Sequence, residues 1–490
     1  MFLRSERGDE TTTSPSHQPP MEEYRVPVSY GAYRPAPCSA PPPQKKKRPY
    51  AFVAHGFMGA KLSSSEHLEK GSKLGMLFIA VTKYLLQRSA RDPADGRWRR
   101  VKPQASKFNL FLGGACGDGV PFKRLQQRTF QERLVNFYRG FQILCRKSML
   151  VTTLRAHFGA LGRPVPSFLP RSFLFYPAKE EQNEWGAFEK AFLERGRAFG
   201  GEKNAWILKP SDGSKGKHIV VMNSLAAIKE HIEAQKKGSI AWVVQEYIAN
   251  PMLLPGRRKF DIRCWVLLDH NYEAWLYREG VLRTTSTAFT LDPAKLSDPF
   301  VHLSNHCIQT GHPDYGKYEP TNEMFFAEFR EHLDGEYEGR DVLDGVVVPQ
   351  VRSIVAATMA AAKDQMKNMD GNPYKSFNVF GYDFMVDTDL KVSLIEINSS
   401  PAVAGALLPD FTKSLVEKAI DPLFPVPASD ADVASAADEK ENSDKVAGVG
   451  AAGEKEGAGK AAGPSSAGQS SSAWVVCEQC HFGFDVEKST

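Results

Sequence analysis

The sequence predicts a mixed α/β (α+β) protein in which strand runs alternate with amphipathic helices. β-Branched and aromatic residues mark strand runs such as Ala241 to Ile248 and Lys259 to Leu268. Apolar residues at helical spacing predict buried helices at Leu74 to Gln87 and Val347 to Lys367. With 490 residues and a hydrophobic content of 42%, the chain can bury a sizeable core divided among more than one lobe.

The two ends of the chain differ from this body in composition. Residues 1–47 are rich in Pro, Ser and Thr, whereas residues 426–490 are rich in Ala, Gly and Ser and carry eleven acidic and five basic side chains. Neither end shows apolar periodicity, so we predict that both are disordered. The formal charge of +5 therefore conceals a body of +11. Such a body would attract an acidic partner, either nucleic acid or an acidic peptide, and an ordinary solvated surface is the alternative.

No targeting or membrane-spanning segment is expected. The longest apolar run near the N-terminus, Leu74 to Val81, is too short to cross a bilayer, and Met1 to Pro20 is polar. Seven scattered cysteines are typical of reduced thiols in a cytosolic compartment. For the basic run Lys45 to Arg48, three interpretations stay open: a nuclear-import address, a contact for an acidic partner, and a solvated linker.

The stretch from Phe377 to Pro401 predicts a β-hairpin. β-Branched and aromatic residues fill Val379 to Val386 and Val392 to Ile397, and the polar sequence Asp387-Thr388-Asp389 separates them. We expect the two strands to pair antiparallel around a turn at Thr388 to Lys391.

Three side chains with oxygen ligands lie on this hairpin. The expected register places Asp383 directly opposite Glu396, and Asn398 shares the strand face of Glu396 because side chains alternate along a strand. Two carboxylates and an amide oxygen suit Mg²⁺, which completes its coordination shell with water and phosphate. The hairpin therefore predicts a magnesium site. On the hairpin alone, ordinary solvent-facing strand residues remain the alternative.

A short loop between two strand runs has the composition of a phosphate-binding flap. The run Ala205 to Leu208 ends at Lys209, and the loop that follows contains Gly213, Lys215 and Gly216 before the next strand run begins at His218. Backbone amides and lysines of such a loop can hold phosphates. It is not a Walker A loop, because the GKS or GKT ending is missing.

The next two strand runs extend this nucleotide-binding pattern. Ala241 to Ile248 follows the flap, where an adenine would meet a backbone edge. In Lys259 to Leu268, period-two alternation places Lys259, Asp261 and Arg263 on one face. Three charges on one strand face are costly unless they meet a ligand or water, so this face is a candidate binding surface.

Downstream elements contribute further candidates. The segment Glu273 to Thr284 predicts a strand pair that turns at Gly280 and carries Arg283 on its second strand. Ser304-Asn305 is a polar pair in apolar surroundings. His302, His306 and Cys307 lack a second ligand pair, so a structural role is favoured over a metal site.

A last motif stands near the C-terminus. Cys477-x-x-Cys480-His481 matches the attachment pattern of c-type haem. Because the chain shows neither an export route for haem attachment nor a second ligand pair for zinc, we assign no site there.

Four candidate elements follow one another along the chain: a flap preceded by a lysine, an adenine-edge strand, a charged strand face and a carboxylate hairpin. In this order they resemble the nucleotide site of an ATP-grasp fold. From about Tyr50 to Pro425, roughly three quarters of the chain, the sequence resembles the tubulin tyrosine ligase family. The resemblance rests on these phrases: KFNLFLG, VNFYRG, LCRKS, RKFDIRCWVLLDH, LYREGVLRT, HLSNHCIQ, YGKYE, NEMFF, FGYDFMVD and LIEINSSPA.

The resemblance implies roles for individual residues. Lys209, Lys215 and Gly216 would bind the ATP phosphates, Gln245, Glu246, Tyr247 and Ile248 would form the adenine edge, and Lys259 and Asp261 would contact phosphate and ribose, with Ser304 and Asn305 nearby. Asp383, Glu396 and Asn398 would hold Mg²⁺, while Arg263 and Arg283 would face the transferred phosphoryl group and the incoming amino acid. Two positions depart from the family pattern: His218 replaces a glycine, and Glu246 replaces a lysine. An insertion-rich segment, Gly114 to Val120, is a further departure and lies in the predicted N-terminal docking region.

The resemblance also implies a domain organisation. We expect a disordered tail with a basic run (1–47), an N-terminal substrate-engaging domain (48–144), a central ATP-grasp domain (145–252), a C-terminal ATP-grasp domain with the metal hairpin (253–425), and a disordered acidic tail (426–490).

The implied activity is ATP-dependent ligation of tyrosine to the C-terminal glutamate of detyrosinated α-tubulin through an acyl phosphate. The cofactors would be ATP and Mg²⁺, with K⁺ as a further candidate. The partners would be α-tubulin in the αβ dimer and free L-tyrosine, with no nucleic acid and no membrane. The location would be cytoplasmic, with cytoskeletal association. Two alternatives remain: a sister ligase that adds glutamate or glycine, and an inactive tubulin-binding module.

Overall fold

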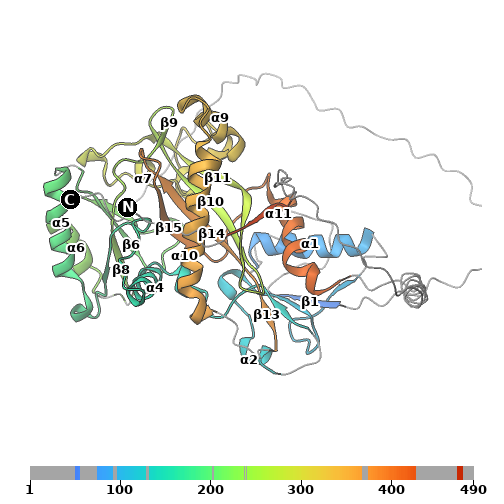
Figure 1. The fold of residues 1–490 in the computed structure, drawn as a ribbon. Helices are drawn as coiled ribbons and strands as arrows, with labels where there is room; N and C mark the ends of the chain where they lie inside the picture. Colours follow the sequence, from blue (N-terminus) through green and yellow to red (C-terminus); the bar gives the residue numbers. More distant parts are fainter. Residues whose placement is uncertain are drawn as a thin grey trace, which may run out of the picture. The chain divides into compact units, whose positions relative to one another are not determined.

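The computed structural model of the chain describes residues 50–55, 74–91, 97–127, 132–200, 203–236, 238, 240–366, 373–425 and 472–477. Within these residues the strands form three sheets, surrounded by helices (Figure 1). This arrangement confirms the predicted α/β class. Several predicted features lie outside the described residues: the tail 1–47, most of the tail 426–490, the basic run Lys45 to Arg48, and Cys480 and His481 of the C-terminal motif. The predicted domain boundaries stay predictions.

One sheet is built mainly from the N-terminal part of the chain. Its strands run in the order β13-β4-β3-β1-β2, with bounds Lys375–Ser376, Leu134–Val135, Leu110–Leu112, Tyr50–Ala54 and Trp98–Arg100, and every pairing is parallel. Helix α1 (Met76–Arg91) buries Leu77, Phe78, Val81 and Leu85 in the adjoining core. Because β13 immediately precedes the hairpin strand, this sheet is fastened to the segment that carries the hairpin.

A second sheet is antiparallel and carries the flap. Its order is β5-β8-β6-β7, with bounds Ser172–Phe175, Trp242–Glu246, Trp206–Pro210 and Val220–Met222. Helices α5 (Trp185–Phe199) and α6 (Leu225–Glu233) lie side by side on this sheet (Figure 1). Phe188 and Ile228 of these helices are fully buried in one apolar cluster with Trp206 and Trp242. The loop between β6 and β7, residues 211–219, is the predicted flap.

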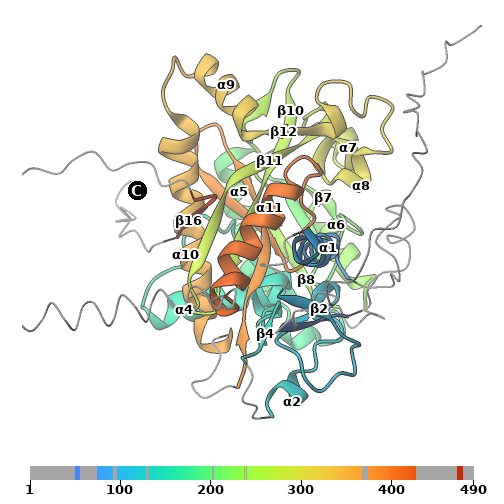
Figure 2. The same ribbon diagram turned by 90° about the vertical axis from the view of Figure 1, so that its right-hand side faces the viewer.

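The third sheet carries the hairpin. Its main path is β12-β11-β10-β14-β15, with bounds Glu323–Phe325, Ala274–Ala288, Arg258–Leu268, Asn378–Val386 and Val392–Asn398. Two short strands extend it: β9 (Leu253–Leu254) pairs with β10, and β16 (Trp474–Val476) pairs with β11 (Figure 2). Strand β10 is buried along its whole length, which explains why its charged residues must find partners inside the protein.

Helices cover this sheet and join it to its neighbours. The helices that have not yet been given are α2 (Phe122–Leu125), α3 (Gln142–Cys145), α4 (Lys147–Ala160), α7 (Pro299–His302), α8 (His306–Gln309), α9 (Phe326–Glu336), α10 (Val348–Met366) and α11 (Leu408–Leu415). Helix α10 buries Val351, Ile354, Val355 and Met359, the apolar stripe that the sequence predicts.

The helical segment Leu343–Met366 is the one part of the described chain that is long and apolar enough to cross a membrane. Its mean hydropathy is 1.4, and 44% of the apolar window is buried inside the protein. A core helix of a soluble protein has the same properties. The buried stripe of α10 accounts for this apolarity, and the absence of a membrane partner stays a prediction.

The structure corrects three predicted elements. The strand pair that turns at Gly280 is wrong, because β11 runs without a turn from Ala274 to Ala288. A Cβ at Gly280 would lie 2.3 Å from the Phe326 ring, so the glycine makes room for that ring. Asp410, which the sequence predicts as the cap of a last amphipathic helix, lies in the first turn of α11 and does not cap it. The predicted structureless tail contains one described strand, β16.

The predicted hairpin forms, with a different turn register. Val386 pairs with Val392 and Phe384 with Leu394, so the turn closes between Asp387 and Lys391. A bulge follows between Asp383 and Phe384, and it shifts the pairing by one residue. Asp383 therefore lies directly opposite Glu396, as predicted, although the turn alone would have paired it with Ile395.

Candidate active site

Most of the predicted site residues line one cavity between the second and third sheets. The predicted residues on its wall are Lys209, Gly216, Gln245, Glu246, Tyr247, Ile248, Lys259, Asp261, Arg283, Ser304, Asn305, Asp383 and Glu396. Arg263 and Asn398 lie just behind this wall in contact with its carboxylates. Lys215 is exposed and does not line the cavity. Residues that are up to 187 positions apart in sequence thus meet in one place.

The three predicted metal ligands are in mutual contact. The Asn398 side-chain nitrogen donates to Asp383 Oδ2 at 3.3 Å and to Glu396 Oε1 at 3.2 Å. The bulge produces this arrangement, because it turns Ile395 and Glu396 toward the cavity together. Here the amide nitrogen faces the carboxylates, so a half-turn of the amide group is needed to present its oxygen to a cation.

Lys147 is a site residue that the sequence prediction missed. This residue begins α4, and its Nζ lies 3.1 Å from Glu396 Oε2 and donates to the Gly213 carbonyl at 2.9 Å. It therefore bridges the flap and the hairpin. Burial alone would raise the pKa of Glu396, but Lys147, Lys209 and Arg283 outweigh burial and hold that pKa well below its usual range. The only sequence signal for Lys147 was its place in the phrase LCRKS.

Two arginines hold Asp383 from neighbouring strands. Arg263, directly across from Asp383 in β10, donates through Nε to Oδ1 and through Nη2 to Oδ2 at 3.0 Å. Arg283 donates to Asp383 Oδ2 at 2.8 Å and through Nε to Asp261 Oδ1 at 2.7 Å. Gly381 lets Arg263 approach, because a Cβ there would lie 3.3 Å from its Nε. Both arginines are thus oriented by paired, fork-like hydrogen bonds.

Burial and these partners fix the charge of Arg283. Burial would lower its pKa, but Asp261 and Asp383 hold the pKa above its ordinary value. The second carboxylate oxygen of Asp261 accepts a hydrogen bond from the Ser304 hydroxyl. The predicted pair Asp261 and Ser304 therefore forms part of the same network as the arginines.

A chain of hydrogen bonds fixes Lys259 at the other end of the cavity. Its Nζ donates to the Tyr247 hydroxyl at 2.7 Å and to the His302 carbonyl at 3.0 Å. His302 Nε2 must donate to the Lys295 carbonyl, at 3.1 Å, so Nδ1 accepts from the Tyr247 hydroxyl at 2.8 Å. Burial lowers the pKa of His302 to about 4, which keeps the ring neutral in this role.

Burial also disfavours the protonated forms of two lysines, Lys259 and Lys209. It lowers the pKa of Lys259 to about 7 and that of Lys209, which Lys147 lowers further, to about 8. Lys209 Nζ donates to Gln245 Oε1 at 2.8 Å, and Gln245 in turn donates to the Ser172 hydroxyl at 2.9 Å. Neither lysine is paired with a carboxylate through a described contact, so both are available for an anionic ligand.

The flap contains several residues with left-handed backbone conformation. Lys215 has φ 59°, Gly216 has φ 71° and His218 has φ 60°. Successive residues of this kind direct backbone amides into a concave anion site. Glycine adopts such a φ without strain, so His218, which departs from the family pattern, stands where the backbone favours glycine. The Cys307 thiol donates to the Lys215 carbonyl at 3.4 Å and so connects the flap to α8.

The predicted adenine edge lies at the end of β8. Tyr247 N–H donates to the Ala205 carbonyl, whereas no acceptor for the Ile248 N–H is found among the described residues. A free N–H at the wall of a cavity that also contains Ile207, Ile219 and Met385 suits the polar edge and flat face of a base.

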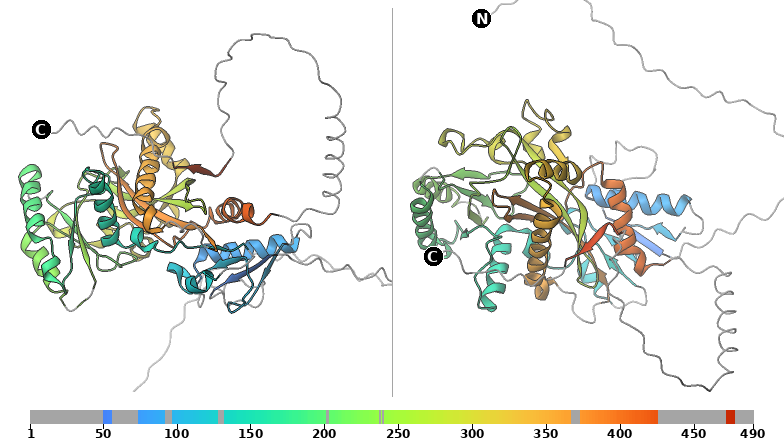
Figure 3. Two further views of the ribbon diagram at one scale, coloured as in Figure 1. Left: turned by 60° about the horizontal axis from the view of Figure 1, so that its bottom comes forward. Right: turned by 45° about the horizontal axis from the view of Figure 1, so that its top comes forward.

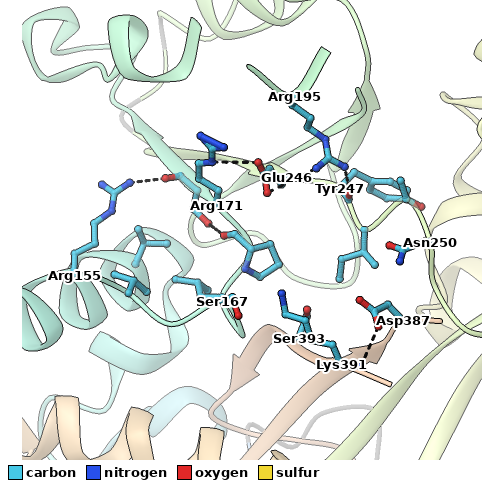
Figure 4. A pocket seen from close by; sticks show the side chains of 17 residues that line it. Arg155, Ser167, Arg171, Arg195, Glu246, Tyr247, Asn250, Asp387, Lys391 and Ser393 are labelled. Carbon is cyan, nitrogen blue, oxygen red and sulfur yellow. Dashed lines mark hydrogen bonds and ion pairs between the residues drawn. The ribbon is translucent and has the colours of Figure 1, made fainter. Parts of the chain in front are cut away.

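Glu246 faces away from this edge into a second cavity. That cavity measures about 390 Å³ and shares Pro170 and the segment Glu246 to Ile248 with the first (Figure 4). Arg171 Nε lies 3.2 Å and Arg195 Nη1 3.8 Å from the Glu246 carboxylate. These ion pairs neutralise the Glu246 carboxylate. A glutamate in place of the family lysine therefore does not disturb the backbone of the predicted adenine edge.

The carboxylate hairpin can supply part of a cation site. The described residues contain no cluster of three or more His, Cys, Asp or Glu side chains suited to a metal. Two carboxylates and one amide match the partial shell that a protein offers Mg²⁺, with phosphate and water completing it. Lys147, Arg263 and Arg283 now neutralise these carboxylates, so a cation would enter together with an anionic ligand.

Comparisons with known proteins identify the family. The sequence pattern of the tubulin-tyrosine ligase family matches residues 124–432, which include every residue of the site. The chain is 34% identical over 207 residues to tubulin glycylase 3C of Tetrahymena thermophila, covering 41% of this chain and 18% of the relative. It is 37% identical over 212 residues to human protein monoglycylase TTLL8, covering 41% of this chain and 24% of the relative.

The chain thus matches about a quarter or less of the length of these curated relatives. The family match itself extends over more than half of the chain and covers the second sheet, the main path of the third sheet and the hairpin. The predicted family is confirmed: the chain belongs to the tubulin-tyrosine ligase family of ATP-grasp-like ligases.

Proposed function

We propose that the chain catalyses the ATP-dependent ligation of a free amino acid, through its amine, to a carboxylate of tubulin. The observation that carries the proposal is the charge of the cavity. Five basic side chains surround the carboxylates of Asp261, Asp383 and Glu396, which leaves an excess of two cationic groups when Lys209 and Lys259 are protonated. The five are Lys147, Lys209, Lys259, Arg263 and Arg283. A buried excess of positive charge favours a polyanion, and ATP is the polyanion that the sequence resemblance implies.

ATP binding requires the flap to move. The cavity measures about 70 Å³, the space of roughly two water molecules, and is therefore too small for a nucleotide. The Lys147 contact to Gly213 and the Cys307 contact to Lys215 hold the flap against the cavity. We expect these contacts to open for ATP and to close afterwards, which excludes water from the reacting phosphate.

Asp383, Glu396 and Asn398 would hold Mg²⁺, which neutralises phosphate charge when it is bound. Lys209 and Lys259 would bind the phosphate chain, and the N–H of Ile248 would donate to the base. Lys147, whose Nζ lies 3.1 Å from Glu396 Oε2, would supply a further cationic group for the terminal phosphate.

The reaction would proceed in two substitutions. An oxygen of the acceptor carboxylate attacks the γ-phosphorus of ATP, the bond to the β-phosphate oxygen breaks, and ADP leaves. The amine of the free amino acid then attacks the acyl phosphate carbon, and inorganic phosphate leaves as the amide bond forms. Arg263 and Arg283, which their carboxylate partners hold in place, would stabilise the negative charge on the transferred phosphoryl group and on the incoming carboxylate.

The choice of amino acid has two candidates. The named relatives are a tubulin glycylase and a protein monoglycylase, and this favours glycine. The long phrases that resemble the tyrosine-ligating member, among them RKFDIRCWVLLDH and LYREGVLRT, favour tyrosine. The assembled lysines, arginines and carboxylates count against an inactive binding module, which would have no need to retain them.

One experiment separates these candidates. The chain is incubated with ATP, Mg²⁺ and detyrosinated or native tubulin, and labelled glycine, tyrosine or glutamate is offered separately. Incorporation of one amino acid with release of phosphate supports the ligase and identifies its substrate. A chain that incorporates none of the three while it still binds tubulin would overturn the proposal in favour of the binding module.

A further inference from the structure

The edge of β11 that lies away from the active site binds a segment from the far end of the chain. In β16, Trp474 pairs with Tyr277, Val475 with Leu276, and Val476 with Trp275 (Figures 2 and 3). The ladder continues at both ends. Arg278 N–H donates to the Ala473 carbonyl at 3.0 Å, and Cys477 N–H donates to the Ala274 carbonyl at 2.8 Å. The segment is therefore extended and paired through most of residues 472–477.

Trp474 fills an apolar pocket on this edge. Its side chain is 3% exposed, and its ring lies 5.1 Å from that of Tyr277 and 5.3 Å from that of Phe411, both in edge-to-face geometry. The indole N–H is buried and has no hydrogen-bond partner among the described residues. The pocket therefore recognises an aromatic ring by its shape and apolar surface and makes no use of the indole nitrogen.

Two arginines hold the backbone of the segment at its ends. Arg352 of α10 donates through Nε and Nη2 to the Val476 carbonyl, at 3.2 and 2.8 Å. Arg278 Nε donates to the Ser472 carbonyl. These contacts are made to backbone carbonyl groups, so they favour an extended chain of any sequence. The pocket for Trp474 makes the site prefer an aromatic side chain.

All groups that receive the segment come from outside it. They are Ala274 to Arg278 of β11, Arg352 of α10 and Phe411 of α11, and residues 426–471 separate the segment from the preceding described residue, Pro425. We propose that this edge of β11 is a peptide-binding site for an extended segment with an aromatic residue followed by two β-branched residues. Residues 472–477 are its intramolecular ligand, added to the sheet by strand addition.

The site is separate from the proposed catalytic machinery. Arg283 lies on the same strand, but its partners are Asp261 and Asp383, and neither touches β16. Loss of the docked segment should therefore leave ligation within about twofold of the wild-type rate. The binding test below does not depend on ligation, so its outcome is independent of the proposed function.

The test uses the full chain with Trp474→Ser and a fluorescent peptide of residues 470–479 that carries serine at position 477. The expected result is saturable binding to the variant and at least tenfold weaker binding to the wild-type chain, whose site is occupied. A peptide with phenylalanine in place of tryptophan should bind, and one with serine there should not. Phe199→Ser, which changes an exposed aromatic residue, should behave as the wild type does. A folded Trp474→Ser chain that binds no peptide would overturn the proposal.

A second measurement covers the case in which Trp474→Ser does not fold. A protease site is inserted between residues 430 and 465 of the otherwise wild-type chain and cleaved under native conditions. The C-terminal fragment should stay bound during gel filtration and be displaced by excess peptide. Immediate release of the fragment would contradict the assignment. A dimer in which the copies have exchanged their C-terminal fragments would contradict the intramolecular ligand.

Discussion

Lys147 connects the flap to the carboxylate hairpin, with its Nζ 3.1 Å from Glu396 Oε2 and 2.9 Å from the Gly213 carbonyl oxygen. Its side chain is 10% exposed, so both contacts are largely shielded from water. One lysine thus links the flap of the proposed ATP site to its proposed metal ligands.

Lys147→Met should remove this link with little change in side-chain length. We expect the rate of ATP-dependent ligation to fall by about 100-fold, because a buried cation next to the transferred phosphate is lost. Lys190→Met, at an 80% exposed position, is the matched control and should leave the rate unchanged. Steady-state kinetics with varied ATP checks this. Equal rates for both variants would contradict a role for Lys147 in the site.

Glu396→Gln should abolish ligation and leave the fold intact. The substitution keeps the size of the side chain but removes the negative charge, and a neutral amide is a poor ligand for a hard divalent cation. We expect at least a ~100-fold loss of rate that is not restored by excess Mg²⁺. Glu331→Gln, at an exposed position on α9, serves as the control. Near-normal turnover of Glu396→Gln would refute the metal assignment.

ATP binding should take up protons at pH 8. Lys259 and Lys209 have pKa values of about 7 and 8 in the absence of ligand, so Lys259 is mostly neutral and Lys209 is half neutral at this pH. Phosphate charge next to them raises both pKa values, and the lysines then gain about 1.4 protons in total. At pH 6 both are already charged, and the uptake should vanish.

Calorimetric titration with ATP in buffers of different ionisation enthalpy measures this uptake. Lys259→Met should reduce the proton uptake at pH 8 by more than half, because Lys259 is the more neutral of the two. Proton release on binding, or uptake that is the same at pH 6 and pH 8, would show that neither lysine faces the nucleotide.

Glu246→Gln should change the KM for ATP by less than about threefold. The carboxylate points into the second cavity, where Arg171 and Arg195 hold it, and the proposed contact with the base is made by the backbone of the same strand end. Kinetics with ATP checks the KM. A tenfold rise in KM would place the Glu246 side chain on the nucleotide.

Arg258→Met should destabilise the protein by about 3 kcal/mol, because it leaves the buried carboxylate of Glu319 without its partner. Arg258 donates to both oxygens of Glu319 at 2.6 Å, and its side chain is 4% exposed. The control is Arg330→Met, which removes an exposed ion pair with Asp344 and should cost less than about 1 kcal/mol. Denaturant unfolding of both variants measures the difference. Equal losses would contradict the buried-pair argument.

Local patterns predicted much of the fold and the site. Alternation along β10 placed Lys259, Asp261 and Arg263 on one face, and all three now meet partners at or next to the cavity. Antiparallel pairing placed Asp383 opposite Glu396. The first prediction needed only the two-residue period of a strand. The second holds because the unpredicted bulge offsets the one-residue difference in the turn.

The features that the sequence did not predict depend on contacts across long stretches of chain. Lys147 reaches Glu396 from a helix 249 residues earlier, and no spacing rule connects them. The short run that forms β16 cannot form a strand without the edge of β11, and composition predicts a structureless tail around it. Gly280 has the usual signature of a turn, but the Phe326 ring that occupies its vacant side decides otherwise.

The bulge beside Asp383 also bears on how a change in the length of this strand should be interpreted. Ile395 is the extra residue, and it lines the cavity next to Glu396. Deleting it would leave Phe384 opposite Leu394 and Asp383 opposite Glu396, so the carboxylate pair would survive while one apolar contact of the cavity is lost. A relative that is one residue shorter here can therefore remain an active ligase, and a gap at this position in an alignment is not evidence of lost catalysis.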